Sequence, residues 1–449
     1  MLDIRDFGAQ VGLLCTDAIQ SAIDMAHQRG GDRVQVPAGT WISGTIELRS
    51  GVELHLGAGA CLTGSDNPAD YRATEVAGEY GGSASGFLIV ADDCKDIAIS
   101  GRGCIDGRGQ SFMEGFRSTE GPYIRKPKSW RPRGIGLTRC QQVTLSDFTI
   151  RDAAQWTIHL TGCEDVLCQG LRILNALDIP NNDGIDPDRC RRVRIIGCHI
   201  EAGDDCIVLK CTKDHPELGD CEDIVISGCT LISTSAALKI GTESHGNFRR
   251  IVATGNTISR SHRGLTIQLR DGGHVEDIIF ADTVIETRHF HPMWWGQAEA
   301  VSITAVPRQE GVQVGSISRV SLRNLICRGE NGIFIHGDPS APICDLSMDG
   351  IQVAVGRSSK WPGGQHDLRP SGGEEHGGLY VAPCPAIYLA HTRDAHLHKL
   401  RVRWLGEPAE WFSHALEAHD CPGLHLDTID GGAASDELPA VLIDGDAKA

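Results

Sequence analysis

The sequence predicts an all-β fold: a single-stranded, right-handed parallel β-helix in which short strands coil into a solenoid, with one helix closing its N-terminal end. Three observations predict this fold. A strand-like pattern recurs every 23 to 31 residues between Val143 and Ile278. The 54 glycines indicate many tight turns. Only one segment has the spacing of an amphipathic helix. Coils of one solenoid share one core, so we expect a single domain over residues 1–449.

The expected helix runs from Thr16 to Met25, with Thr16 as its N-cap. One face of this helix is apolar and is formed by Ile19, Ala22, Ile23 and Ala26. A short helix with one apolar face can cover the open end of a solenoid and protect its first strands from pairing with other chains.

The strands are expected where apolar residues alternate. Each repeat begins with an apolar, any, apolar pattern, and the repeats start at Ile97, Val143, Val166, Val193, Ile224, Ile251, Ile278, Val320 and Leu346. Alternation indicates short strands, and a period in the twenties is typical of a solenoid. Leucine-rich repeats would need a leucine and asparagine ladder that is missing, and helical repeats would need longer helices. A parallel β-helix remains.

The seventeen cysteines follow the same repeat. Each of five lies three residues before a repeat start, namely Cys94, Cys140, Cys163, Cys190 and Cys221. A residue type at one phase of a repeat predicts a column of small apolar side chains inside the fold. We therefore expect free thiols and a reducing compartment rather than disulfides or a metal site.

The repeat is interrupted at residues 67–87, 107–133 and 287–308, and the glycine-rich segment 356–383 is expected to be a further loop insertion. Residues 405–449 are expected to form a C-terminal coil and tail. Long loops in a regular solenoid are often functional.

Composition excludes some partners. A net charge of −17 without a Lys/Arg run argues against nucleic acid. No apolar stretch approaches the roughly 20 residues that span a bilayer. If Met1 is the native start, the lack of a signal sequence predicts a cytoplasmic protein, and a periplasmic or secreted one if a signal was removed. We expect a monomer.

Aspartates cluster on two successive repeats. One reads Asn181-Asn-Asp-Gly-Ile-Asp186, and the next reads Gly203-Asp-Asp-Cys206. Asp183 precedes Asp204 by 21 residues and Asp205 by 22, about one coil, so these carboxylates should stack. Like charges raise each other's pKa. Glycoside hydrolysis needs carboxylates of different proton affinity, although a calcium site or a solvated turn could have the same composition.

These two motifs resemble the signatures of glycoside hydrolase family 28, the polygalacturonases and their exo-acting bacterial relatives. The flanking segments Arg131-Pro-Arg-Gly-Ile, Trp156-Thr-Ile-His159, Lys210 and Trp294-Trp295-Gly also resemble bacterial members, and the likeness runs from Asp3 to Trp404. The resemblance implies that Asp204 is the general acid, that Asp183 and Asp205 activate water, and that the anomeric carbon is inverted without a metal ion or an organic cofactor.

The chain departs from the family at the substrate-binding motifs. Ser235 stands where the family has a histidine, and Thr266 and Gln268 replace the arginine and lysine that bind galacturonate. Neutral side chains cannot replace charge-assisted contacts, so we expect a neutral terminal sugar of a pectic oligo- or polysaccharide rather than plain polygalacturonate. Lys239, Arg263 and Arg270 could act as substitute cations, which leaves an acidic sugar open.

Further substrate contacts are expected from Asn181, Asp186, His159, Lys210, His245, Trp294 and Trp295. His245 could replace the missing histidine, and the tryptophans could stack on sugars. The long loops could block one end of the binding groove and make the enzyme exo-acting. Two alternatives are a polysaccharide lyase or epimerase and a non-catalytic carbohydrate-binding β-helix.

Overall fold

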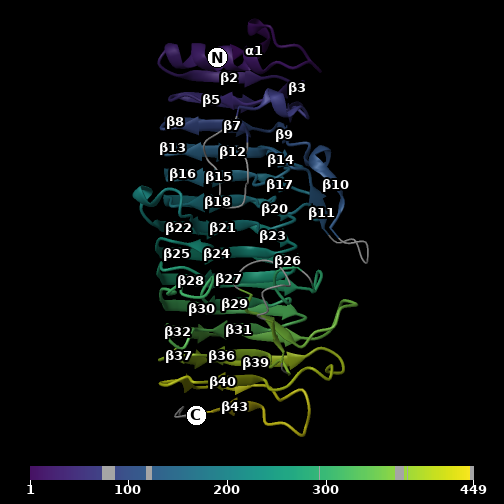
Figure 1. Cartoon of the computed structure of the whole chain (residues 1–449), viewed down its shortest axis with the longest axis vertical. Coiled ribbons are helices and arrows are strands. Elements are labelled where there is room, and N and C mark those ends of the chain that lie inside the picture. Colours follow the sequence, from purple (N-terminus) through teal and green to yellow (C-terminus); the bar gives the residue numbers. More distant parts are fainter. Residues whose placement is uncertain (73–85, 118–123, 293, 370–378, 382, 445–449) are drawn as a thin grey trace. The chain divides into compact units, whose positions relative to one another are not determined.

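The computed structural model describes residues 1–72, 86–117, 124–292, 294–369, 379–381 and 383–444, with side chains left aside for 379–381. The chain divides into two compact units, Met1–Cys229 and Thr230–Ala449, and each is described by itself. Both units consist of coils of parallel strands, and the predicted right-handed parallel β-helix is confirmed (Figure 1). The expectation of one domain over 1–449 stays a prediction.

The first unit contains two parallel sheets. The strands of its larger sheet are β1 (Leu2–Asp3), β2 (Asp32–Val36), β3 (Gly39–Ser43), β5 (Val52–Leu56), β6 (Ala60–Gly64), β8 (Lys95–Gly101), β9 (Cys104–Asp106), β13 (Gln141–Ser146), β14 (Thr149–Arg151), β16 (Glu164–Gln169), β17 (Arg172–Leu174), β19 (Arg191–Ile196), β20 (His199–Ala202) and β22 (Cys221–Ser227). The strands of its smaller sheet are β4 (Ile46–Glu47), β7 (Phe87–Asp92), β12 (Arg133–Thr138), β15 (Ile158–Thr161), β18 (Ile185–Asp188) and β21 (Ile207–Cys211).

The second unit repeats this plan. The strands of its larger sheet are β23 (Thr230–Ser233), β25 (Phe248–Thr254), β26 (Thr257–Ser261), β28 (Val275–Thr287), β30 (Ile317–Gly329), β32 (Ile343–Asp349), β33 (Gln352–Val355), β37 (Thr392–Arg393), β38 (His396–His398), β39 (Leu400–Trp404), β41 (His425–Leu426) and β42 (Ile429–Asp430). The strands of its smaller sheet are β24 (Ala236–Ser244), β27 (Arg263–Leu269), β29 (Val301–Ala305), β31 (Ile333–His336), β36 (Ile387–Ala390), β40 (Leu416–His419) and β43 (Val441–Ile443).

Within each unit, the residues that start the predicted repeats pair with one another in the larger sheet. In the first unit, Ile97, Val143, Val166, Val193 and Ile224 pair in that order on successive coils. In the second unit, Ile251, Ile278, Val320 and Leu346 do the same. All of these residues are buried, so the alternating pattern identified the side chains that fill the core.

The N-terminal helix is α1 (Thr16–Gln28), and Ile19, Ala22, Ile23 and Ala26 are buried as predicted. The prediction of Thr16 as the N-cap was wrong. The cap residue is Cys15, and the Thr16 hydroxyl instead accepts a hydrogen bond from the backbone N–H of Gly44 at 2.8 Å. The helix packs against β2, β4 and β5, which places it over the first coils of its unit. Short 3-10 helices are η1 (Ile4–Phe7), η2 (Pro68–Asp70), η3 (Gly109–Phe112) and η4 (Pro216–Leu218).

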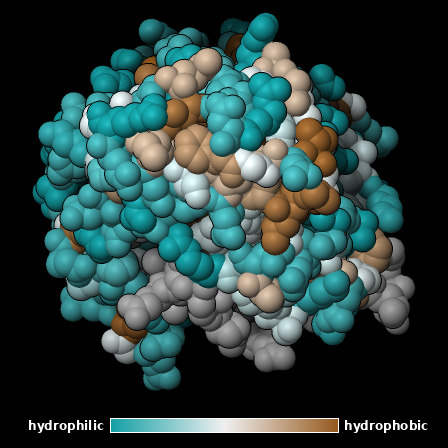
Figure 2. Space-filling model, turned by 90° about the horizontal axis from the view of Figure 1, so that it is seen from above, coloured by the Kyte–Doolittle hydropathy of each residue, from teal (hydrophilic) through white to brown (hydrophobic). Residues whose placement is uncertain are grey.

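Figure 2 is the view from above, from the side on which α1 is drawn in Figure 1, and shows a mostly hydrophilic face with one hydrophobic patch. The segment before α1 has exposed apolar side chains at Val11, Leu13 and Leu14. Among the described residues, the structure contains no helix that is both long and apolar enough to cross a membrane.

The predicted cysteine column is confirmed. Cys94, Cys140, Cys163, Cys190 and Cys221 are all buried, and every cysteine of the chain is a free thiol. The thiols of Cys163, Cys190 and Cys221 each donate to a carbonyl oxygen of the previous coil, at 3.3, 3.2 and 3.6 Å.

The insertions are only partly described, because residues 73–85, 118–123, 293, 370–378, 382 and 445–449 lie outside the described residues. Within 107–133, β10 (Met113–Phe116) and β11 (Arg125–Pro127) form an antiparallel hairpin beside the coils of the first unit (Figure 1). Within 356–383, β34 (Gln365–Asp367) and β35 (Leu379–Val381) also pair in antiparallel fashion. Described parts of 287–308 and 356–383 meet where the indole N–H of Trp361 donates to the carbonyl of Phe290 at 2.9 Å.

Candidate active site

The aspartates of the first unit lie just before two neighbouring strands of the smaller sheet. Asp183 precedes β18, and Asp204 and Asp205 precede β21. Ile185 pairs with Ile207, and the backbone N–H of Gly184 donates to the carbonyl of Asp205 at 2.9 Å. Asp183 and Asp205 therefore occupy the same place on successive coils, as the 22-residue spacing predicted.

The glycines of both motifs allow the two coils to approach closely. A Cβ atom on Gly184 would lie 2.4 Å from the carbonyl oxygen of Cys206, and one on Gly203 would lie 2.3 Å from that of Ile179. Backbone atoms cannot yield at such distances, so only glycine fits at either position. The motif glycines thus fix the spacing of the carboxylates.

Three carboxylates converge at this point. Oxygen atoms of Asp183, Asp204 and Asp205 lie within 4.8 Å of one another, and the three residues are 3%, 7% and 1% exposed. Asn181 adopts a left-handed conformation (φ 58°) and its backbone N–H donates to Asp204 Oδ2 at 3.1 Å. The N–H of Asp205 donates to the other oxygen, Oδ1, at 3.1 Å. Both oxygens of Asp204 are therefore oriented by the backbone.

Burial and mutual repulsion favour protons in this cluster. Desolvation, followed by the charges of Asp186 and Asp204, raises the pKa of Asp183 well above its usual range. Desolvation raises the pKa of the fully buried Asp186 to about 8, although the cation of Lys210 opposes the shift. Lys210 Nζ lies 3.8 Å from Asp183 Oδ2. The carboxyl groups of Asp183 and Asp186 therefore keep their protons to a higher pH than ordinary aspartates do.

Cations and an aromatic ring surround the cluster. The Arg133 guanidinium lies 4.3 Å from the ring centroid of Trp156, and Lys210 Nζ lies 4.8 Å from the same centroid. Arg133 is buried, and its three side-chain nitrogens have no hydrogen-bond acceptor within the described part of the chain. Burial lowers the pKa of Arg133 to about 10, and the charges of Asp186 and Asp183 oppose this. The aromatic face replaces hydrogen bonds as a support for this cation.

His159 lies beside Asp186 in the register of β15 and β18. Its Nε2 lies 3.5 Å from Asp188 Oδ2 and 3.3 Å from the Thr161 hydroxyl. Desolvation lowers the pKa of His159, although the hydrogen bond with Asp188 opposes this shift. His159 also lines a cavity of about 490 Å³ together with Phe87, Gly136, Thr161, Arg139 and His215, among other residues. A cavity of this size and polarity suits a sugar.

Three neighbouring carboxylates could also ligate a cation. Asp183 Oδ1 is buried without a hydrogen-bond partner, which suits a ligand atom, but Lys210 brings a positive charge to the other oxygen of the same side chain. Calcium prefers six to eight oxygen ligands. With one cation already resident, this donor set fits a second one poorly. Catalysis without metal or cofactor stays a prediction.

The second unit contains the residues that replace the family's substrate motifs. Ser235 precedes β24, and its backbone N–H donates to the Ser233 hydroxyl at 2.8 Å. Lys239 on β24 pairs in register with Thr266 on β27, and both are buried. Arg263 Nη2 reaches the Ser235 hydroxyl at 3.4 Å. Ser235, Lys239, Thr266 and Arg263 thus lie on neighbouring coils, as expected from their spacing.

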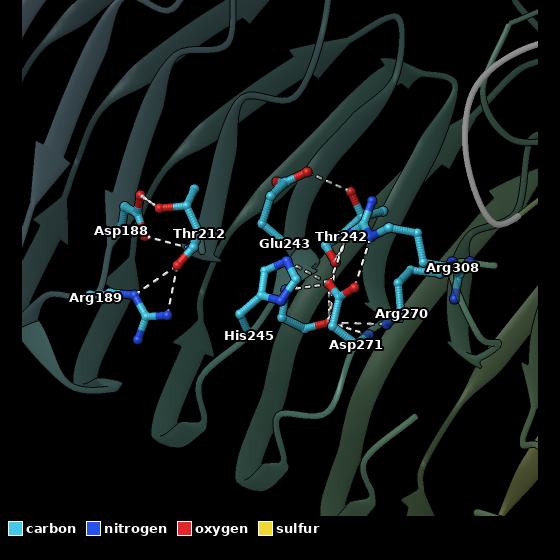
Figure 3. A network of polar contacts seen from close by, with 10 residues as sticks. Asp188, Arg189, Thr212, Thr242, Glu243, His245, Arg270, Asp271 and Arg308 are labelled. Carbon is cyan, nitrogen blue, oxygen red and sulfur yellow. Dashed lines mark hydrogen bonds and ion pairs between the residues drawn. The ribbon is translucent and has the colours of Figure 1, made fainter. Parts of the chain in front are cut away.

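His245 does not lie where the missing histidine would be. Ser235 precedes the first residue of β24 and His245 follows its last, so the two residues lie at opposite ends of this strand. His245 Nε2 instead lies 3.6 Å from Asp271 Oδ2, and Arg308 binds the same carboxylate (Figure 3). His245 therefore belongs to a charged network at the far end of the strand.

The two tryptophans of the 287–308 insertion differ in exposure. Trp294 is buried, with 6% of its surface exposed, and its carbonyl accepts a hydrogen bond from Arg369. Trp295 is half-buried, and the Arg369 guanidinium lies 5.6 Å from its ring centroid. Of the pair, Trp295 has more ring surface available for a sugar.

Sequence reasoning missed two buried asparagines that hold the aspartate motif in place. The Asn182 amide oxygen accepts from Gly203 N–H at 2.7 Å, and its Nδ2 donates to the Ala176 carbonyl at 2.9 Å. Asn175 Nδ2 donates to the Asn182 carbonyl at 2.8 Å. The doublet Asn181-Asn182 was a signal for this role, because asparagine commonly bridges backbone groups in turns.

Comparisons with known proteins concern the family and the fold of the chain. The sequence profile described as Glycosyl hydrolases family 28 matches residues 27–362. A "Probable polygalacturonase" of Vitis vinifera is 31% identical over 301 residues, which cover 63% of this chain and 60% of the relative. An "Exo-poly-alpha-D-galacturonosidase" of Dickeya chrysanthemi is 24% identical over 334 residues, or 64% and 55% of the two chains. This chain thus spans about 60% of the first relative's length.

Solved structures share the fold. A family 28 exopolygalacturonase of Yersinia enterocolitica superposes with a TM-score of 0.71 at 20% identity, over 96% of this chain and 79% of that one. An exopolygalacturonase of Thermotoga maritima gives 0.65 at 24% identity, over 79% and 87%. With the profile matching well over half of its residues, the chain belongs to glycosyl hydrolases family 28.

Proposed function

We propose that this chain is an exo-acting, inverting glycoside hydrolase that removes a terminal sugar from a pectic oligo- or polysaccharide other than plain polygalacturonate. One observation carries the proposal: three buried carboxylates, Asp183, Asp204 and Asp205, with oxygens within 4.8 Å of one another. Such a cluster lowers the stability of the fold, because each negative charge disfavours the others. Its presence therefore favours a functional role.

In the proposed mechanism Asp204 donates a proton to the leaving oxygen. The backbone N–H groups of Asn181 and Asp205 fix the orientation of its carboxyl group. Asp183 and Asp205 hold the attacking water and accept its proton. Lys210, 3.8 Å from Asp183, opposes the rise in the pKa of Asp183 and so favours the ionised form that this step needs. A proton shared within one cluster supplies both an acid and a base.

Inversion is proposed from membership of the family. Carboxyl groups of inverting enzymes are usually about 6.5–9.5 Å apart and those of retaining enzymes about 5–5.5 Å. The oxygens of this cluster lie within 4.8 Å. Spacing alone would therefore favour retention, and the stereochemistry of the product separates the two.

Exo action is supported by the anchoring of one insertion next to the aspartates. Arg125, on the β10–β11 hairpin, forms an ion pair with Asp178 at 2.9 Å. Arg131 donates to the side chain of Asn181 at 2.7 Å. An insertion fastened to the segment that leads to Asp183 can limit how far a polymer extends past the site. The names of the Dickeya and Thermotoga proteins point the same way.

A substrate other than plain polygalacturonate is supported by Thr266 and Gln268. Both side chains are buried and neutral where the family motif has two cations. At these two positions, a polymer with a carboxylate on every sugar would place negative charge against neutral side chains.

The decisive test is Asp204→Asn with product analysis by NMR. The amide fits the same space but cannot donate the proton, so kcat should fall by at least about 10²-fold while the thermal midpoint stays close to that of the wild type. Asp165→Asn is the matched control, because Asp165 is an exposed aspartate whose contacts are with Arg192. Most of the activity remaining in Asp204→Asn would refute the assignment of the acid.

A further inference from the structure

Five arginines of this chain hold a carboxylate in the same way. Each of the five uses the edge of the guanidinium formed by Nε and Nη2, with one nitrogen donating to each carboxylate oxygen at 2.7 to 3.3 Å. This two-point contact matches the planar carboxylate and is the strongest geometry available to arginine. The pairs are Arg5–Asp3, Arg192–Asp165, Arg308–Asp271, Arg319–Asp277 and Arg369–Asp367.

Arg270 has this same edge free. The residue is fully buried, and its Nε and Nη2 have no hydrogen-bond acceptor among the residues that the structure describes. Only Nη1 is engaged, with the carbonyls of Leu269 at 3.0 Å and Thr304 at 3.4 Å. Burial lowers the pKa of Arg270 to about 9, so the guanidinium remains charged at neutral pH. A buried cation without an anion is costly.

The nearby carboxylates are already taken. Asp271 is bound by the Nε/Nη2 edge of Arg308 and accepts from the backbone N–H of Ser244 at 3.0 Å (Figure 3). Asp367 is bound by Arg369 and by the N–H of Gly296 at 2.6 Å. Neither oxygen pair is available to a second arginine fork.

The side chains around Arg270 are hydrogen-bond donors without acceptors. Gln268 on β27 pairs in register with Thr304 on β29, and Gln268 Nε2 and Thr304 Oγ1 are both buried without partners in the described structure. Thr304 pairs in turn with His336, and burial lowers the pKa of His336 to about 4, which leaves the imidazole neutral. Arg270, Gln268, Thr304 and His336 together carry one positive charge and no negative charge. The charges of Asp367 and Asp271 oppose the fall in the pKa of Arg270, but both carboxylates are bound by other arginines.

We infer that Arg270, with Gln268 and Thr304, forms a subsite for the carboxylate of one uronosyl residue. The inference rests on the proposed function, because it takes the ligand to be part of the polysaccharide substrate. It also gives the substitution at Gln268 another meaning: the cation has not been lost but stands two residues later, directly after the last residue of β27. A single fork beside neutral Thr266 suits a mixed chain with a uronosyl residue next to a neutral sugar.

The test is ligand-induced stabilisation of the full chain, which needs no turnover. The probes are D-galacturonate, D-galactose and acetate, which separate a uronate from a neutral sugar and from a carboxylate alone. Galacturonate at about ten times its Kd should raise the thermal midpoint by about one to two degrees, and the other two should raise it far less. Arg270→Gln should abolish the shift. Arg189→Gln is the matched control, because Arg189 is also buried but donates only to the carbonyls of Thr212 and Gly219.

Gln268→Glu gives a second test that does not depend on removing a buried arginine. The new carboxylate would fill the free edge of Arg270, so the midpoint without ligand should rise and the galacturonate shift should vanish. A lower midpoint for Gln268→Glu, or an equal response of the wild type to galactose and galacturonate, would overturn the inference. In that case the proposed function could still hold, because it is tested by whether Asp204→Asn loses the hydrolysis of a neutral glycoside. The two proposals can therefore fail separately.

Discussion

At the residue scale, burial raises the pKa of carboxyl groups near the site, and Asp186 shows this most clearly. It is fully buried, both of its carboxylate oxygens lack partners among the described residues, and desolvation raises its pKa to about 8. In the unfolded chain an aspartate has a pKa near 3.9. The folded state therefore binds this proton more tightly than the unfolded state.

The sign of the pH dependence follows from linkage. Because the folded pKa is raised, the stabilisation is complete below about pH 4 and is lost as pH rises through about 8. The wild-type thermal midpoint should fall between about pH 4 and pH 8, and that of Asp186→Asn should fall less, since its amide does not ionise. Parallel curves for the two proteins, measured beside Asp165→Asn, would show that Asp186 is ionised when folded.

At the scale of elements, residues at the same position of successive coils form columns. These columns explain why part of the structure could be predicted. A residue type that recurs at one phase must occupy one column, so the repeat starts and the cysteines identified core positions directly. The aspartate cluster followed from the same rule. The free edge of Arg270 could not be predicted, because it depends on which arginine binds Asp271 and which binds Asp367. The Arg125–Asp178 contact was equally hidden, since it joins residues 53 apart outside the repeat.

The cysteine column gives a prediction at this scale. Desolvation raises the pKa of the Cys163 and Cys221 thiols well above the usual range, so neither forms a thiolate readily. Of the seventeen thiols, only Cys61, Cys104 and Cys344 are half-buried rather than buried. Titration with a thiol reagent should therefore label at most about these three in the native protein and nearly all seventeen after denaturation without reductant. Several unreactive cysteines in the denatured protein would reveal disulfides and overturn the column as a set of reduced thiols.

Cys61 should react first among them. A hydrogen bond from Cys104, its register partner on β9, lowers the pKa of Cys61 to about 6. Peptide mapping after brief labelling identifies the residue, and faster labelling of Cys344 would contradict the order.

At the scale of the whole molecule, the lengths of the reaction products test whether the insertions restrict the enzyme to chain ends. In the first unit, the β10–β11 insertion packs through a small apolar cluster of Phe112 and Met113 with Ala154 and Ile179. Trp130 packs against this cluster and also contacts the ring of Tyr71, with centroids 5.2 Å apart. Apolar packing and the Arg125 ion pair hold the described part of this insertion in place, and under the proposed exo action it acts as a fixed wall beside the site.

A fixed wall next to the aspartates should admit chain ends only. Digestion of a mixed pectic oligosaccharide should release monosaccharide from the first time point, with no ladder of intermediate lengths. Replacing residues 114–126 by a short Gly-Ser linker removes the wall but leaves Phe112, Arg131 and the three aspartates, so intermediate lengths should then appear while hydrolysis continues. Chromatography of early time points distinguishes the two patterns. A ladder produced by the intact protein would show that the groove is open past the insertion, and an unchanged monosaccharide pattern in the shortened variant would place the block elsewhere in the chain.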